Sequence, residues 1–339
     1  MRVYFTVDTE CSMGGAWTHQ DRRPVGAARH IFCRIRDKYF GVPLLTSMME
    51  EFGFKGTYFV ETFATRCLGE SDIRPVFEFL LQQGQDVQLH IHPVFRQYAE
   101  FRRALDAGGE YRGSEPMDLL GHMGVSAQME LLEEAIDQFV SFAGYRPSAF
   151  RAGCFAGSRS MLKCLSQVGI ALDSSYNPCN YPISFPDGAP EPNVAQKIEG
   201  TWEIPVTVAR TPLPEGSNGY KCADCSSLSF PEIRAMLEAA VNAGQEHFVI
   251  VFHSFSAVKM KDETYAEMRP NRIVIRRLEK LFRYLAGHTV QYQVETMGNV
   301  ALDSQALRAG ASAGAVANLG FLAATKRKAV QFLNNAYWV

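Results

Sequence analysis

The sequence predicts an α/β protein built from parallel βα units, closed as a barrel or open as a doubly wound sheet. Two observations in its 339 residues support this class. Short segments with the two-residue alternation of strands take turns with longer segments that have helical spacing. Several of the strand-like segments also end in ionisable residues, as strands do where α/β folds build their active sites.

The expected elements follow one another along the first 300 residues. Strands are predicted at 2–10, 56–61, 86–92, 148–153, 170–175, 201–208, 247–254 and 290–295. Helices are predicted at 42–53, 73–84, 126–144, 158–169, 230–244 and 271–287. The polar, basic stretch 11–38 predicts a long loop beside the first strand.

The tail, residues 301–339, differs from the barrel-like region 1–300. It begins with an Ala/Gly-rich stretch that predicts a linker, and residues 321–339 predict an amphipathic helix with basic residues. Such a helix could pack on the domain, on a second copy in a homo-oligomer, or on a membrane surface. Packing is the expected outcome.

Composition excludes several classes of protein. The net charge of −2 gives no basic surface for nucleic acid. No apolar stretch approaches the ~20 residues of a transmembrane helix, and the strand pattern directly after Arg2 is unlike a signal peptide. A cytoplasmic protein is therefore expected, with its eight cysteines as free thiols. Cys222 and Cys225 have the spacing of half a zinc site or of a redox pair. No second such pair completes a zinc site, so two free thiols in a Ser/Gly-rich loop are expected.

Two strand ends carry paired polar side chains. Asp8 and Glu10 project from one face of the first strand, and His90 and His92 from one face of the third, because residues two apart face the same way. The opposite, apolar faces must pack under helices, which leaves the polar faces to line the barrel. We therefore expect the two pairs to meet at the carboxyl ends of neighbouring strands.

Further strands end in Arg151, Asp173 and His253, and Glu203 lies in another. Each residue alone has a structural explanation, such as a hydrogen-bonded rim histidine or a structural Arg–Asp pair. Together they favour a site. Two imidazoles and one carboxylate with an open position are typical of catalytic zinc. A second carboxylate, kept ionised by an arginine, could take the proton from the attacking water, and a histidine could protonate the leaving group. These groups together are typical of metal-assisted hydrolysis of an amide or ester.

The segments FTVDTE, LHIHP, FRAGCF, LDSS, EIPVTV and IVFHSF resemble, in order and approximate spacing, the polysaccharide deacetylases, or NodB-homology group. The resemblance covers about residues 1–300. It implies an α/β fold of the distorted (β/α)7 barrel type. It also implies removal of N- or O-acetyl groups from sugars with a divalent metal ion, expected to be zinc.

The resemblance also implies roles for matching residues. Asp8 matches the general base, Arg151 the arginine that holds it, and His253 the general acid. Asp173 matches the residue that tunes this acid. A backbone N–H near Cys154 or Phe155 would donate to the oxyanion.

The metal ligands depart from the family pattern. Thr9 stands where the family has a metal-binding aspartate, so Glu10 is the expected ligand. Val94 stands where the family has its second histidine, so His90 and His92 are the expected pair.

The expected substrate is an N-acetylated sugar in a polysaccharide, as in exopolysaccharide biosynthesis, or in a lipid-linked or nucleotide-linked precursor. Trp17 lies in the first loop and could contact this substrate, or simply pack a solvated loop. Two alternatives stay open. One is a metal-free hydrolase of a cyclic amide or ureide on the same barrel. The other is a non-catalytic carbohydrate binder, against which the intact Asp8, Arg151 and His253 speak.

Overall fold

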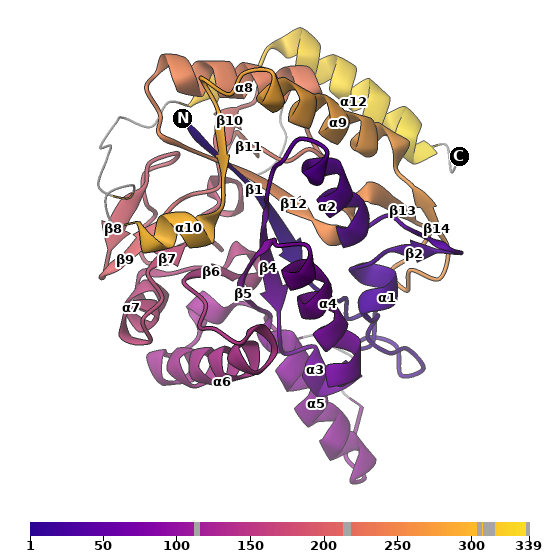
Figure 1. Cartoon of the computed structure of the whole chain (residues 1–339). Helices are drawn as coiled ribbons and strands as arrows, with labels where there is room; N and C mark the ends of the chain where they lie inside the picture. The colour runs from indigo at the N-terminus through magenta and orange to yellow at the C-terminus, as the bar shows by residue number, and fades with distance from the viewer. Residues whose placement is uncertain (112–115, 213–217, 304–306, 308–315, 337–339) are drawn as a thin grey trace.

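A nine-stranded sheet curled into a half-barrel forms the centre of the protein (Figure 1). The computed structural model describes residues 1–111, 116–212, 218–303, 307 and 316–336. The sheet order is β12 (His247–His253), β1 (Arg2–Thr9), β4 (Thr57–Glu61), β5 (Asp86–Ile91), β6 (Ala149–Ala152), β7 (Leu172–Asp173), β9 (Thr201–Glu203) and β8 (Gln196–Ile198). β15 (Gln293–Glu295) also pairs with β1.

All neighbouring pairs from β12 to β9 are parallel, and β8 runs antiparallel to β9. Helices alternate with these strands: α2 (Val42–Glu50), α4 (Glu70–Gln82), α6 (Val125–Ala143), α7 (Arg159–Gln167), α8 (Phe230–Asn242) and α9 (Arg272–Ala286). The gap between β9 and β12 is bridged by Thr207, which bonds Val249 through backbone and hydroxyl at 3.2 and 2.8 Å. The predicted barrel of βα units is confirmed.

The two faces of β1 carry different side chains, as the alternation predicted. Val3, Phe5 and Val7 belong to the main hydrophobic core under the helices. Tyr4 belongs to a smaller cluster on the opposite face. Burying each large apolar side chain contributes about 1.5–3 kcal/mol, so this alternation fixes which face of the strand points inward. Asp8 therefore lies on the inner face.

One prediction of local structure was wrong, and one helix was missed. Residues 11–38 are not one loop, because they include the short helix α1 (Ala27–His30) and the strand β2 (Arg34–Ile35). β2 forms a hairpin with β3 (Lys38–Tyr39). A helix, α5 (Pro93–Asp106), was not predicted. Its first residue is proline, which suits the first turn of a helix because the missing N–H would have no partner there.

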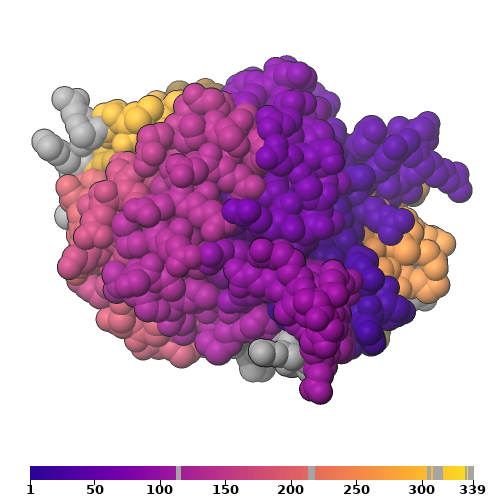
Figure 2. Space-filling view, turned by 90° about the horizontal axis from the view of Figure 1, so that it is seen from below, coloured from indigo at the N-terminus to yellow at the C-terminus, as the bar shows by residue number. Residues whose placement is uncertain are grey.

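The hairpin of β2 and β3 lies beside a second hairpin, formed by β13 (Val258–Met260) and β14 (Met268–Pro270). Both views of the molecule show these indigo and orange segments side by side (Figures 1 and 2). Residues of β2 and β14 also line one shallow pocket.

The tail docks on the barrel region through two further elements. β16 (Ala317–Asn318) pairs with β10 (Val208–Arg210), which also pairs with β11 (Tyr220–Cys222). The last helix, α12 (Phe321–Ala336), lies near α8 and α9 (Figure 1), and Arg327 Nε is 3.0 Å from Glu232 Oε1 in a fully buried ion pair. Much of the predicted linker lies outside the described residues.

Across the described part of the chain, every helix is too short or too polar to span a bilayer.

Candidate active site

Asp8 and Arg151 form a buried ion pair at the inner face of the barrel. Arg151 Nη1 donates to Asp8 Oδ1 at 2.7 Å and to the hydroxyl of Thr6 at 2.9 Å. The rest of the guanidinium donates to the carbonyl and hydroxyl of Ser174 and lies 4.4 Å above the ring of Phe59. Arg151 is thus held from several sides, and it fixes the orientation of the Asp8 carboxylate.

Glu10, His90 and His92 come together at the carboxyl ends of β1 and β5, as the sequence predicted. Glu10 Oε2 is 2.5 Å from His92 Nε2 and 3.2 Å from His90 Nε2. One ligand atom from each of the three residues lies within 4.8 Å of the others. Two imidazole nitrogens and a carboxylate at this spacing are a donor set that a divalent metal ion can use.

The far nitrogens of both imidazoles are held by acceptors. His90 Nδ1 donates to the carbonyl of Arg151 at 2.7 Å, which also joins the three-residue cluster to the Asp8–Arg151 pair. His92 Nδ1 contacts the carboxylate of Asp118. Because a carbonyl can only accept, His90 carries a proton on Nδ1, and this bond orients the ring so that Nε2 faces Glu10. Metal-binding histidines are typically oriented in this way.

The pKa shifts of Glu10 and His92 indicate that the cluster favours a positive charge at this position. Burial alone would raise the pKa of Glu10, but the charge of His92 and the hydrogen bonds from His90 and His92 hold this pKa well below its usual range. Burial would likewise lower the pKa of His92, yet Asp118 and Glu10 raise it well above its usual range. The two carboxylates therefore stabilise a cation between them, and metal ions compete with protons for such positions. The residues fit a divalent cation.

Asp118 and Gly153 support His92, and the sequence analysis found neither. Asp118 contacts the imidazole through Oδ2 and accepts the N–H of Val94 through Oδ1 at 3.0 Å. Gly153 lies flat against the ring, since a Cβ there would be 2.5 Å from His92 Nδ1. Asp118 lies in a connection without periodic pattern, so only the structure identifies it.

We expect Gly153→Ala to destabilise the protein by about 1–3 kcal/mol, the usual cost of overpacking a filled site. The His92 ring has little freedom to move because Glu10 and Asp118 hold both its nitrogens. Thermal unfolding measures the effect. Gly124→Ala is the matched control, because nothing lies within 4 Å of a Cβ at that position. Equal melting temperatures for the two variants would contradict the prediction.

His253 lies at the end of β12, directly beside Asp8 in the strand register. Its Nε2 is 3.8 Å from Asp8 Oδ2, and its side chain is 30% exposed. The predicted base and acid are thus brought together, with the imidazole facing solvent where a substrate can approach.

Asp173 is not brought to His253. Asp173 pairs in register with Phe150, whose side chain belongs to the main core. Arg151, the next residue, points to the other face of the sheet. The carboxylate of Asp173 accepts from the hydroxyl of Ser175 at 2.7 Å and lies against Glu203. Burial, and then the neighbouring Asp173, raises the pKa of Glu203 well above its usual range, so this carboxyl pair shares a proton. The two carboxyl groups are therefore part of the packing between β7 and β9.

Cys154 and Phe155 follow β6 in a single 3-10 turn, Gly153–Phe155. Both residues have left-handed backbone, with φ of 56° and 55°. Such a conformation costs a non-glycine residue roughly 1 kcal/mol or more and concentrates at functional sites. The turn lies beside the cluster, because Gly153 touches His92 and Cys154 Sγ lies within 4.8 Å of donor atoms of His92 and Asp118.

An open pocket of about 400 Å³ leads to Glu10 and His92. Its wall includes His30, which the sequence analysis also missed. His30 Nδ1 donates to the backbone carbonyl of Glu10 at 2.6 Å, and burial lowers its pKa to about 4, so the ring is neutral. Phe255 and Tyr265 pack on this ring and form another part of the wall.

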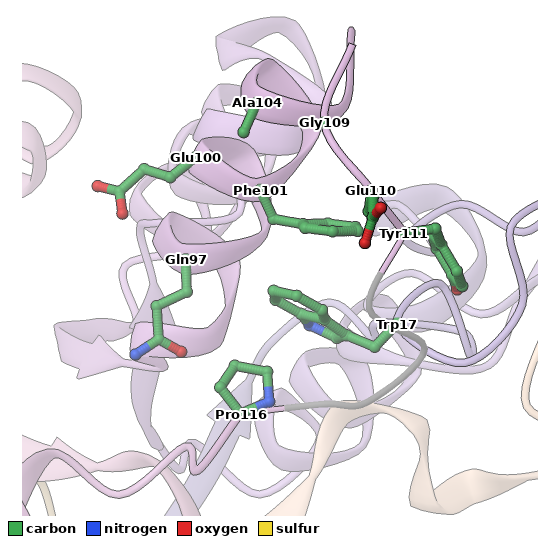
Figure 3. A pocket seen from close by; sticks show the side chains of 9 residues that line it. All are labelled: Trp17, Gln97, Glu100, Phe101, Ala104, Gly109, Glu110, Tyr111 and Pro116. Carbon is green, nitrogen blue, oxygen red and sulfur yellow. The ribbon is translucent and has the colours of Figure 1, made fainter. Parts of the chain in front are cut away.

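Trp17 does not line this pocket. It is buried and packs on Tyr98 and Phe101, with ring centroids 5.2 and 5.0 Å away. Figure 3 shows it in a separate pocket, with Phe101 above it, Tyr111 to one side and Gln97 to the other. The next residue, Thr18, does line the pocket at Glu10.

One known structure shares this fold. No protein-family model matches the sequence, and neither does any protein of curated function. A Mycobacterium smegmatis protein described as a polysaccharide deacetylase is 16% identical, with 94% of this chain and 93% of that one aligned at a TM-score of 0.52.

Two further structures align at lower scores. A Pseudomonas aeruginosa protein described as a polysaccharide deacetylase is 13% identical over 88% of this chain and 89% of that one, with a TM-score of 0.48. Puue allantoinase is 12% identical over 92% and 91%, also with a TM-score of 0.48. The likeness to the M. smegmatis protein shows the fold: the chain has the (β/α) barrel of the polysaccharide deacetylases, as the sequence motifs suggested.

Proposed function

We propose that the protein is a metal-dependent hydrolase that removes acetyl groups from an N-acetylated or O-acetylated sugar. One observation carries the proposal: the Glu10, His90 and His92 cluster adjoins an Asp8–Arg151 pair and the partly exposed His253 on the same barrel rim. A binding protein would have no use for a paired acid and base beside a set of metal ligands.

Each residue then has a chemical task. Glu10, His90 and His92 would hold the ion, which when bound supplies Lewis acidity that polarises a carbonyl and acidifies water. Asp8 takes the proton of the attacking water, and Arg151 keeps Asp8 oriented and ionised. His253 gives a proton to the departing amine or alcohol. The strained turn at Cys154 and Phe155 would donate a backbone N–H to the developing oxyanion.

The proposed metal is zinc, because imidazole nitrogen with one carboxylate suits this ion. The proposed substrate is an N-acetylated sugar within a polysaccharide or within a lipid-linked or nucleotide-linked precursor. The open pocket at Glu10 supports a substrate that enters with one end while the remainder stays outside.

Acetate release from N-acetylated oligosaccharides tests the proposal, together with metal analysis of the purified protein. We expect acetate release that a chelator abolishes and added zinc restores. Turnover by metal-free protein would overturn the assignment of the three ligands and favour the hydrolase of a cyclic amide or ureide. Sugar binding without acetate release would favour a non-catalytic protein.

Asp118→Asn should weaken zinc binding by about 10–100-fold, the usual effect of removing a group that orients a metal-binding histidine. The amide keeps the shape of the side chain but loses the charge that faces His92. Titration of metal-free protein with zinc, against a competing chelator, measures the affinity. Asp106→Asn is the control, because this carboxylate pairs with Arg102 on the exposed end of α5. Wild-type affinity in Asp118→Asn would show that Asp118 does not support the site.

A further inference from the structure

The segments that carry two cysteines far apart in the sequence pack on each other, and the thiols of these cysteines face each other. Cys179 lies in the short 3-10 turn Pro178–Asn180, called η3, and Cys222 ends β11. Both residues are only partly buried. The pairing differs from the one that the Cys222–Cys225 spacing suggests.

Cys225 is a poor partner by comparison. It is fully buried, and burial raises the pKa of its thiol. Arg277 donates to its backbone carbonyl at 3.2 Å and to that of Ser226 at 3.0 Å, which holds this segment under α9. The thiol of Cys225 is therefore held in the core while that of Cys222 faces η3.

The two segments that carry Cys179 and Cys222 are joined by further contacts. The Asn218 side-chain amide, just before β11, donates to the carbonyls of Tyr181 and Pro178 at 3.1 and 3.4 Å. These bonds flank Cys179 on both sides along the chain. The approach of the two thiols thus belongs to the packing of η3 against β11.

The chemistry of the pair favours oxidation. The hydrogen bond from the Cys222 thiol, opposed by burial and aided by the charge of Lys221, lowers the pKa of Cys179. The thiolate is the form of cysteine that attacks disulfides. A partly exposed thiol with thiolate character, touching a second thiol, has the arrangement of an attacking and a resolving cysteine.

We propose that Cys179 and Cys222 are a disulfide-forming pair, which a low-molecular-weight disulfide oxidises reversibly. The Cys179 thiolate attacks one sulfur of oxidised glutathione, forms a mixed disulfide and releases one glutathione thiolate. The Cys222 thiolate then attacks the Cys179 sulfur and releases the second glutathione. Two protein thiols are oxidised, one glutathione disulfide is reduced to two thiols, and the two protons pass to the solvent or the glutathione thiolates.

The bridge would lie close to the candidate active site. Asn180, the residue after Cys179, donates its side-chain N–H to the carbonyl of Cys154 at 3.4 Å. Oxidation would therefore tie β11 to the segment that supports the strained turn after β6. The inference does not depend on the proposed activity, since it concerns the thiols alone.

The test uses the full chain, treated with oxidised glutathione and digested without reductant. Mass spectrometry with fragmentation of the linked peptides identifies the bonded sulfurs. We expect an intramolecular Cys179–Cys222 bond, with two hydrogen atoms lost, that dithiothreitol reverses. The bond should persist in Cys225→Ser and disappear in both Cys222→Ser and Cys179→Ser. Circular dichroism of the reduced variants checks that each is folded.

Two results would overturn the proposal. One is a Cys222–Cys225 bond in the oxidised wild type. The other is a wild-type protein in which Cys179 and Cys222 remain open to alkylation after treatment that modifies the exposed thiol of Cys154.

Discussion

Asp8→Asn should lower the rate of acetate release by about 10²–10⁴-fold, the usual contribution of a general base, and should leave the metal in place. The amide can still accept a hydrogen bond from Arg151, but it cannot take a proton from water. Asp8 is not among the three ligands, so metal analysis of the variant should match the wild type. Acetate assays at saturating substrate measure the turnover.

The control for this variant is Asp86→Asn. Asp86 is a partly buried carboxylate on the same barrel, at the start of β5, where it accepts hydrogen bonds from Thr57 and Gln88. Asp86 lies at the opposite end of β5 from His90, so the change removes a carboxylate without altering the proposed catalytic residues. Asp86→Asn should keep the wild-type rate. Equal rates in Asp8→Asn and the wild type would remove Asp8 from the mechanism.

His90→Ala should abolish both metal binding and turnover. The change removes one of three ligand side chains and leaves the carbonyl of Arg151 without its imidazole partner. Two remaining ligands bind zinc far more weakly than three. Metal analysis after dialysis, followed by acetate assays, measures both losses.

His247→Ala is the matched control for loss of a buried histidine. His247 begins β12, at the opposite end of the strand from His253, and its Nδ1 is 2.8 Å from the hydroxyl of Tyr4. It should lower stability but retain the metal. A His90→Ala protein that carries a full complement of zinc would show that His90 is not a ligand, and the His90–Arg151 bond would then be structural.

The difference between the residues that could and could not be predicted lies in strand geometry. β1 and β5 are long enough for their alternation to be read, so the common direction of Asp8 with Glu10 and of His90 with His92 follows from the sequence. β7 has two residues, which is too short for such a pattern, and Asp173 faces the β9 carboxyl instead of His253. The position of Asp173 at a strand end was not enough to predict the direction in which its side chain points.

Asp118, His30 and Gly153 were missed for a different reason. They contact the proposed metal-binding residues from segments that are far apart in the sequence, as His30 does at the carbonyl of Glu10. Local patterns carry no information on these contacts. A lone aspartate in an aperiodic connection has many roles, and only the three-dimensional structure shows that this one faces an imidazole.

The ion pair between α8 and α12 bears on how the newly made chain matures. Glu232 caps the start of α8 together with Ser229, yet its other oxygen meets Arg327, which the ribosome adds 95 residues later. Until then a carboxylate destined for the interior lacks its cation, which is costly in a buried position. The packing around Glu232 is therefore completed only after α12 has left the ribosome and Arg327 has reached this carboxylate.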